Sequence, residues 1–387
     1  MKQARTFREM LHLIRLAVKA VFLVLILGSR CLFNWRLKNS TVFKKEWLSL
    51  SYGNKSVPGI LYTTQRDQVR PVFLLIAGIG TYINKRRLFH RMARSLALAG
   101  YHAVIYEDPD LDNGSLSLKT VENIKHVFRA ISVNRIADAK RIVLIGSDFS
   151  ARFIMSAITD KNINCLVRSI LLFSPVSDLK TSSKFAFTGK IRAFGKLSYL
   201  EPASSPRFVF LNNIFKEYFK RDLSPGVQSI IEDLLKNRTD IALRNINRLD
   251  VDAKNNLLSV FRGEMEPEEV GRLLKINYQR LEDRVFDPLP EHDLEKPVFL
   301  IHNILDRYVD YGQSTMLFDR LHSSTGIYLH LTNFLIGDEA VSVFSNPARW
   351  FKGAAALSRT YYRLFAAVYT SKNLPYNPTG KPLRYRI

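Results

Sequence analysis

A carboxylate at residue 148 stands between two small residues, Gly146 and Ser150, each two positions away. The run 141–145 before it predicts a buried strand, and residues 149–158 predict an amphipathic helix. A nucleophile on a sharp strand-to-helix turn needs small residues at these two positions, so that the chain can pass closely. A carboxylate placed there can attack an electrophilic carbon and form an ester. Asp148 is equally suited to be the N-cap of the helix, and the sequence leaves both interpretations open.

Hydrolysis of such an ester requires a base that activates water, most often a histidine. No histidine follows His330 in the chain, and His330 itself falls within a predicted strand. Asp338 and Glu339 lie beyond that strand, but a carboxylate with an ordinary pKa of about 4 is a weak base for water. The sequence therefore predicts an altered site in which turnover is slowed or lost.

The elements around Asp148 alternate between buried strands and amphipathic helices. A hairpin over residues 46–64 comes first, and the predicted strands that follow are 72–76, 103–106, 141–145, 169–173, 298–301 and a last one opening at 327–329. Helices are expected between them and over 347–369. This alternation predicts an α/β fold with a mostly parallel sheet and helices on both faces. Between residues 177 and 296 this alternation stops. Several signals for helix N-termini in this stretch predict a helical cap insertion.

Four segments, in this order, resemble the α/β-hydrolase superfamily: 77–80 (AGIG), 108–115 (DPDLDNGS), 145–152 (IGSDFSAR) and 301–309 (IHNILDRYV). They resemble the oxyanion loop, the turn after the next strand, the nucleophile elbow and the stretch that carries the triad acid. The resemblance implies an α/β-hydrolase core over 46–176 and 297–370, with the cap at 177–296. An elbow with Asp at its centre is similar to that of epoxide hydrolases and haloalkane or haloacetate dehalogenases.

That resemblance implies a role for each matching residue. Asp148 would be the nucleophile and Asp306 the triad acid, while the backbone N–H groups of Ile79 and Phe149 would form the oxyanion hole. Arg152 matches a position that holds a substrate carboxylate in haloacetate-type members; a solvated helix residue paired with an acid is the alternative. The sequence departs from the family at Ala77, where a histidine is usual, and in having no histidine after the last strand.

The N-terminal segment, 1–45, differs from the rest of the chain. Only residues 20–28 are free of charge, which is short of the ~20 residues that a membrane span needs. A helix that begins at Leu11 is long enough to span the membrane if the charged ends of Arg15 and Lys19 extend to the membrane–water interface. We expect a single uncleaved N-terminal anchor helix, with a cleaved signal peptide and an in-plane amphipathic helix as alternatives. Both flanks are basic, so the side of the membrane is not predicted.

The net charge of +22 (57 Lys+Arg, 35 Asp+Glu over 387 residues) predicts a polyanionic partner. With an anchor present, anionic lipid headgroups explain this charge, and no nucleic-acid-binding motif accompanies it. Residues 371–387 form a basic tail. The two cysteines, Cys31 and Cys165, suggest neither a disulfide framework nor a metal site. No glycine-rich nucleotide motif is present, so no cofactor is predicted.

Two functional hypotheses follow. The first is a membrane-anchored α/β-hydrolase-like protein that acts on an ester, lipid-like or small organic substrate with an altered site. The second is a non-catalytic protein of the same fold that binds a ligand or partner at the membrane.

Overall fold

The computed structural model describes residues 11, 13–22, 24, 44–64, 68–79, 83–219, 224–236, 238–284, 294, 296–321, 326–332, 347–369 and 384–385. Its main sheet has the strand order β1-β2-β4-β3-β5-β6-β9-β10-β11. The strands are β1 (Lys44–Tyr52), β2 (Lys55–Thr63), β3 (Arg70–Ile76), β4 (His102–Tyr106), β5 (Ala137–Ser147), β6 (Val167–Phe173), β9 (Val298–Asn303), β10 (Ile327–Thr332) and β11 (Arg384–Tyr385). The β1–β2 and β2–β4 pairs are antiparallel, and the others are parallel. The predicted mostly parallel sheet is confirmed.

Helices cover both faces of this sheet because its central strands are apolar on both sides. In β3, Val72, Leu74 and Ile76 join a cluster with α5 (Leu118–Ser132) and α6 (Asp148–Ala157), called here the α5–α6 cluster. Phe73 and Leu75 point the other way. They join the α3–α15 cluster, formed with α3 (Ile83–Leu98) and α15 (Pro347–Tyr369). Two shorter helices, α4 (Pro109–Asp112) and α14 (Gly312–Arg320), follow β4 and β9.

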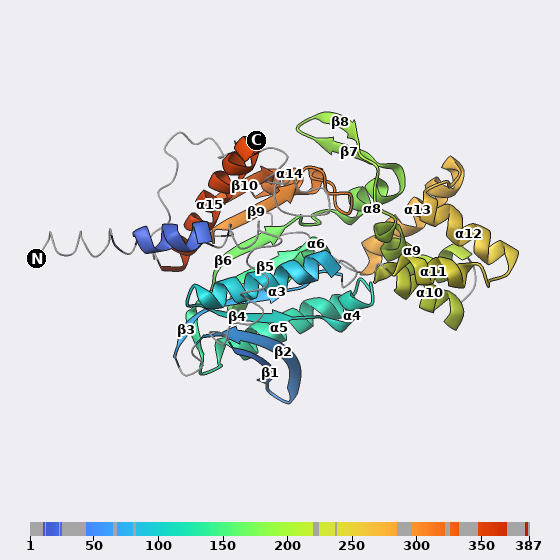
Figure 1. Cartoon of the computed structure of the whole chain (residues 1–387). Coiled ribbons are helices and arrows are strands. Elements are labelled where there is room, and N and C mark those ends of the chain that lie inside the picture. Colours follow the sequence, from blue (N-terminus) through green and yellow to red (C-terminus); the bar gives the residue numbers. More distant parts are fainter. Residues whose placement is uncertain are drawn as a thin grey trace, which may run out of the picture.

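A helical excursion connects β6 to β9. It contains α8 (Leu179–Thr188), α9 (Ser205–Phe219), α10 (Pro225–Leu235), α11 (Thr239–Ile246), α12 (Val251–Arg262) and α13 (Pro267–Arg284). Helices α9 to α13 gather at one end of the molecule, on the right in Figure 1. A short hairpin, β7 (Lys190–Ala193) and β8 (Lys196–Tyr199), interrupts the helices and projects from the body. The sequence patterns did not predict this hairpin, whose strands alternate too briefly to stand out.

The N-terminal helix lies at the opposite end of the molecule from the cap helices (Figure 1). Residues 11, 13–22 and 24 of the expected anchor are described, and they are helical. The remainder of the 1–45 segment, apart from Lys44 and Lys45 in β1, lies outside the described residues, as does the basic tail except for β11. Within the described ranges, no helix is both long and apolar enough to cross a membrane.

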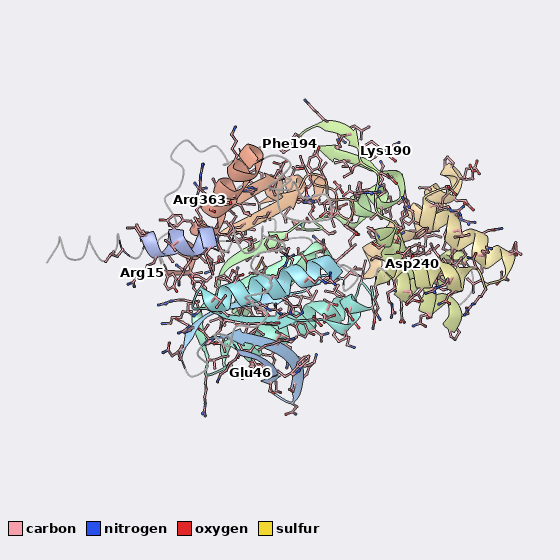
Figure 2. All side chains as sticks on the ribbon, viewed as in Figure 1. Arg15, Glu46, Lys190, Phe194, Asp240 and Arg363 are labelled. Atoms are coloured by element: carbon pink, nitrogen blue, oxygen red, sulfur yellow. The ribbon has the colours of Figure 1, made fainter. Side chains whose placement is uncertain are left out.

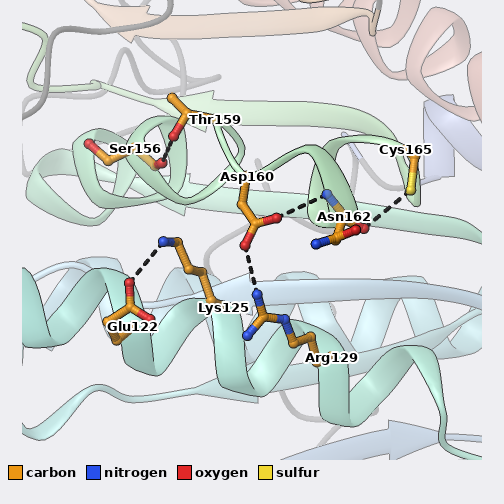
Figure 3. A network of polar contacts seen from close by, with 8 residues as sticks. All are labelled: Glu122, Lys125, Arg129, Ser156, Thr159, Asp160, Asn162 and Cys165. Atoms are coloured by element: carbon orange, nitrogen blue, oxygen red, sulfur yellow. Dashed lines mark hydrogen bonds and ion pairs between the residues drawn. The ribbon is translucent and has the colours of Figure 1, made fainter.

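Polar contacts fix the far end of α6, the helix that begins at Asp148. Arg129 of α5 forms a 2.7 Å ion pair with Asp160, and Asp160 also caps α7 (Lys161–Asn164) by accepting the N–H of Asn162 at 2.9 Å (Figure 3). The thiol of Cys165 lies 3.2 Å from the carbonyl oxygen of Asn162. Asp160 therefore joins the end of α6 to α5.

We expect Asp160→Ala to lower the free energy of unfolding by about 1–2 kcal/mol, since it removes both a helix cap and a partly buried ion pair. Glu122→Ala is the matched control. Its carboxylate, 66% exposed, pairs with Lys125 within a single helix, and removing such a pair costs about 0.5 kcal/mol or less. Urea unfolding of both variants gives the comparison. Equal losses in the two would contradict the joining role of Asp160.

Candidate active site

The turn between β5 and α6 places Asp148 in the left-handed region, at φ 52°. A non-glycine residue seldom adopts this conformation, and such strain collects at functional sites. A Cβ at Gly146 would meet the Cδ1 of Ile154 and lie 3.3 Å from the Cα of Ala151. The strand and the helix therefore approach so closely that a larger residue would require these neighbours to shift. The N-cap position belongs to Ser147, so the interpretation of Asp148 as the N-cap is wrong.

Ser150, where a glycine is usual, stabilises this turn. Its hydroxyl accepts the N–H of Ser147 at 2.9 Å and lies 2.8 Å from the carbonyl oxygens of Ile76 and Ser147. Because Ile76 ends β3, one hydroxyl joins two neighbouring strands at the turn. Serine is small enough for the position and adds hydrogen bonds that glycine lacks.

The loop after β3 passes directly beside the Asp148 turn. A Cβ at Gly78 would lie 2.8 Å from the carbonyl oxygen of Ser147 and 3.0 Å from Oδ2 of Asp148. Ile79 and Phe149, the two residues expected to supply oxyanion donors, are 2% and 1% exposed. The structure therefore brings the 77–79 loop and the start of α6 together around the Asp148 carboxylate.

Asp306 is held in place by its own hydrogen bonds. Its Oδ1 accepts the N–H groups of Tyr308 at 2.9 Å and Val309 at 3.3 Å. Its Oδ2 accepts the hydroxyl of Ser174 at 2.7 Å. Asp306 is 5% exposed and Ser174 is fully buried. In a working triad one carboxylate oxygen accepts a histidine N–H; here a serine hydroxyl binds that carboxylate.

Ser174 was not predicted as a site residue. It directly follows β6 and has a φ of 42°, a second strained residue at the same edge of the sheet. Two residues on, the N–H of Val176 donates to the carbonyl oxygen of Asp148 at 3.0 Å. The loop after β6 thus contacts both the elbow and Asp306, which directly follow β5 and β9, the two strands that flank β6. A serine at the carboxyl end of a buried strand was the signal that could have identified it.

Each described histidine has polar or aromatic neighbours of its own, and for His302 one of these neighbours is in the loop that also binds Asp306. His302 is buried, with Nδ1 2.7 Å from the Ser314 hydroxyl and Nε2 2.9 Å from the Val309 carbonyl oxygen. Nδ1 of His330 lies 3.1 Å from the hydroxyl of Thr360 on α15, which covers the sheet face opposite to α6. The other described histidines lie near Tyr62, the Gln68 carbonyl oxygen and the ring of Tyr52: His90, His102 and His126. His12, His292 and His322 are outside the described residues.

Burial lowers the pKa of His330 to about 4. The unfolded chain takes up a proton near pH 6.5 while the folded state stays neutral, so His330 makes stability fall as the pH drops from 6.5 towards 4. We expect the stability advantage of the wild type over His330→Gln to shrink by about 2–3 kcal/mol across this window. Chemical unfolding at a series of pH values measures this difference. The buried Asp310, whose pKa burial raises to about 7, works in the opposite direction but is common to both proteins. A pH-independent difference would contradict the expectation.

Arg152 is not the solvated helix residue that the alternative interpretation expected. It is 8% exposed, and its Nη1 donates to the carbonyl oxygen of Ser177 at 3.1 Å. Burial lowers its pKa to about 10, with Arg320 contributing, so the guanidinium remains charged at neutral pH. Arg152 lies one helical turn beyond Asp148 and joins α6 to the start of the cap. Its role towards a substrate carboxylate stays a prediction.

Helix α9, in the helical excursion between β6 and β9, contacts the first turn of α6 and the segment after α4. The rings of Phe149 and Phe210, on α6 and α9, meet edge to face with centroids 5.7 Å apart. Asn213 of α9 accepts the N–H of Leu116 at 2.9 Å and donates to the carbonyl oxygen of Gly114 at 2.9 Å. Asp148 is 0% exposed. The Asp148 carboxylate is therefore closed to solvent in this conformation.

In the part of the chain that the structure describes, no three His, Cys, Asp or Glu side chains are grouped so as to hold a metal ion.

No family model and no curated protein matches the chain. Among solved structures, it is similar to a bacterial heroin esterase (14% identity, TM-score 0.45, 87% of this chain and 88% of that chain). It is also similar to esterase B from Lactobacillus rhamnosis (14% identity, TM-score 0.43, 86% of this chain and 93% of that chain). A third similar structure is the uncomplexed Pyrococcus horikoshii acylaminoacyl peptidase (13% identity, TM-score 0.46, 89% of this chain and 45% of that chain). The chain spans less than half the length of that peptidase. From its strand order, its helices on both faces and the strained turn after β5, we conclude that the chain has the α/β-hydrolase fold.

Proposed function

We propose that this protein is a hydrolase-like member of its fold in which Asp148 attacks an electrophilic carbon of a small organic or lipid-like molecule and retains it as an ester. The observation that carries the proposal is the strained Asp148 turn, at φ 52°, with the Gly78 backbone against its carboxylate. A left-handed aspartate persists only where the surrounding structure enforces it, and this one lies where the fold presents a nucleophile.

The first step needs no histidine. A carboxylate oxygen of Asp148 forms a bond to the carbon, and the leaving group departs with the bonding electron pair. A haloacid releases halide, whereas an epoxide opens to an alkoxide that takes a proton from water. We expect Arg152 to favour substrates that carry a carboxylate, because its guanidinium is charged and lies one turn from Asp148.

The second step, attack of water on the ester, is the one that this site supports poorly. The backbone N–H groups of Ile79 and Phe149 remain candidate oxyanion donors. However, Asp306 binds Ser174 and two backbone N–H groups, and His302 and His330 are held by Ser314, Val309 and Thr360. We infer that no residue in the described part of the chain is oriented as this base, which would remove general-base assistance worth about 10²–10⁴-fold in rate. We therefore infer that the ester accumulates.

Binding without chemistry is the second candidate. It is favoured by the complete burial of Asp148 and by the Phe149–Phe210 contact, which together close the elbow in this conformation. The ligand would be lipid-like or a small organic molecule held between α9 and the elbow.

Covalent labelling separates the two candidates. The folded protein, with the exposed Cys165 replaced by serine, is incubated with 2-chloropropionate and with styrene oxide, and its intact mass and peptides are analysed. The proposal predicts one adduct, located on the peptide that contains Asp148 and absent from Asp148→Asn.

Phe210→Ala extends this test because it opens the contact over Phe149. Faster labelling of Asp148 in Phe210→Ala would show that the cap limits access. No adduct in either protein, with both folded, would contradict the proposal and favour binding alone.

A further inference from the structure

The N-terminal helix packs on the body through one stripe. Leu16, Ala20 and Val24 are 1–2% exposed and belong to the α3–α15 cluster, together with Tyr101 and Phe365. Their four-residue spacing places them on the same side of the helix. We call them the inner stripe.

Charged groups reinforce this contact. Nζ of Lys19 lies 4.5 Å from the centre of the Tyr101 ring, a cation–π geometry. Burial lowers the pKa of Lys19, and the nearby cations Arg70 and Arg15 lower it further. The helix is thus docked on the body beside a group of positive charges.

The opposite side of the helix is apolar and exposed. Leu11, Ile14, Val18 and Val21 are 39%, 51%, 63% and 47% exposed, and their spacing of three, four and three residues forms a second stripe. We call them the outer stripe. No charged residue interrupts it, while Arg15, also exposed, borders it. A soluble surface seldom presents such a stripe without a partner for it.

We propose that the outer stripe inserts into the interfacial region of an anionic bilayer, with the helix lying in the membrane plane and its inner stripe still packed on the body. The chemistry of the stripe fits this partner, because apolar side chains enter the acyl boundary while Arg15 meets lipid phosphates. A net charge of +22 favours anionic lipid and disfavours a second copy, whose identical cations would face these ones.

This arrangement replaces a spanning anchor by a peripheral one. If the helix spanned the membrane, the side chains of Leu16, Ala20 and Val24 would have to leave the α3–α15 cluster. Arg15 lies at the end of the molecule remote from Asp240 of the cap (Figure 2), so docking through this helix leaves the cap uncovered. The inference is independent of the chemistry at Asp148.

Vesicle flotation with the full chain tests the partner. We expect binding to vesicles of phosphatidylcholine with 30% phosphatidylserine to exceed binding to phosphatidylcholine alone, and Val18→Asp to weaken it by about tenfold or more. Val133→Asp is the matched control. Val133 is 64% exposed, like Val18, but lies at the end of α5, and we expect it to bind as the wild type does. Equal binding by Val18→Asp and the wild type would overturn the proposal.

Spin-label depth measurements test the orientation. Nitroxides are placed by Leu11→Cys and Val21→Cys, each in a background in which Cys31 and Cys165 are serine. An in-plane helix gives both labels the same shallow depth. A spanning helix would separate them by about 15 Å, at 1.5 Å per residue, and that result would overturn the proposal. A dimer that Val18→Asp dissociates without any loss of lipid binding would also overturn it.

Discussion

Asp306→Ala is expected to lower the free energy of unfolding by about 2–4 kcal/mol, an effect that a residue serving only catalysis would not show. The substitution leaves the Ser174 hydroxyl and the N–H groups of Tyr308 and Val309 without their acceptor, in a region where Asp306 is 5% exposed. Unsatisfied buried donors carry the full cost of desolvation. Chemical unfolding of the purified variant measures the loss.

Asp306→Asn is the matched control for this prediction. Its amide oxygen can still accept the two backbone N–H groups, and its NH2 group can donate to the Ser174 hydroxyl. We therefore expect a loss below about 1.5 kcal/mol, with Ser174→Ala in the same range because it removes one hydrogen bond. If Asp306→Ala unfolds like the wild type, Asp306 does not hold the loop after β9 and the structural role argued here is wrong.

Asp108→Ala is expected to cost still more, about 3–5 kcal/mol. Asp108 is 1% exposed. Five donors converge on its carboxylate within 2.8–3.2 Å: the hydroxyls of Tyr106 and Thr120, the Asn123 amide, and the N–H groups of Asp110 and Leu111. The Oδ1 of Asn123 in turn accepts a hydrogen bond from Nζ of Lys55 at 2.6 Å. The network therefore reaches from α4 and α5 to β2.

Asp110→Ala provides the comparison for Asp108. Asp110 lies in the first turn of α4 as an acidic residue, and removing such a charge costs about 0.3–1 kcal/mol. Thermal and urea unfolding of the two variants should therefore differ severalfold. A loss for Asp108→Ala as small as that for Asp110→Ala would show that the network contributes little.

Much of the fold follows from local patterns. Runs such as 72–76 and 170–173 are apolar at every position because both faces of their strands are covered, and such runs predict a parallel sheet directly. The Asp148 turn could also be predicted. Gly146 and Ser150 must be small because the strand and the helix that follows it pass closely, and these segments are adjacent in the sequence. The structure adds that Ser150 bonds to Ile76, which sequence spacing cannot show.

The site could not be completed from the sequence because its remaining contacts join distant segments. Ser174 and Asp306 are separated by 132 positions and meet only when β6 and β9 pair. Arg152 is buried because the start of the cap returns to α6 at Ser177, whereas its helical position alone suggested solvent. The two faces of the N-terminal helix likewise become distinct only when Leu16 and Val24 pack against the α3–α15 cluster.

The most direct test of Asp148 is the amount of halide released from 2-chloropropionate per protein chain over time. An ester that forms but is not hydrolysed predicts a burst that stops at about one equivalent, which Asp148→Asn abolishes. Continued release over many equivalents, lost in Asp148→Asn, would contradict the account, because it would require a base for water that the Asp306–Ser174 pair does not provide.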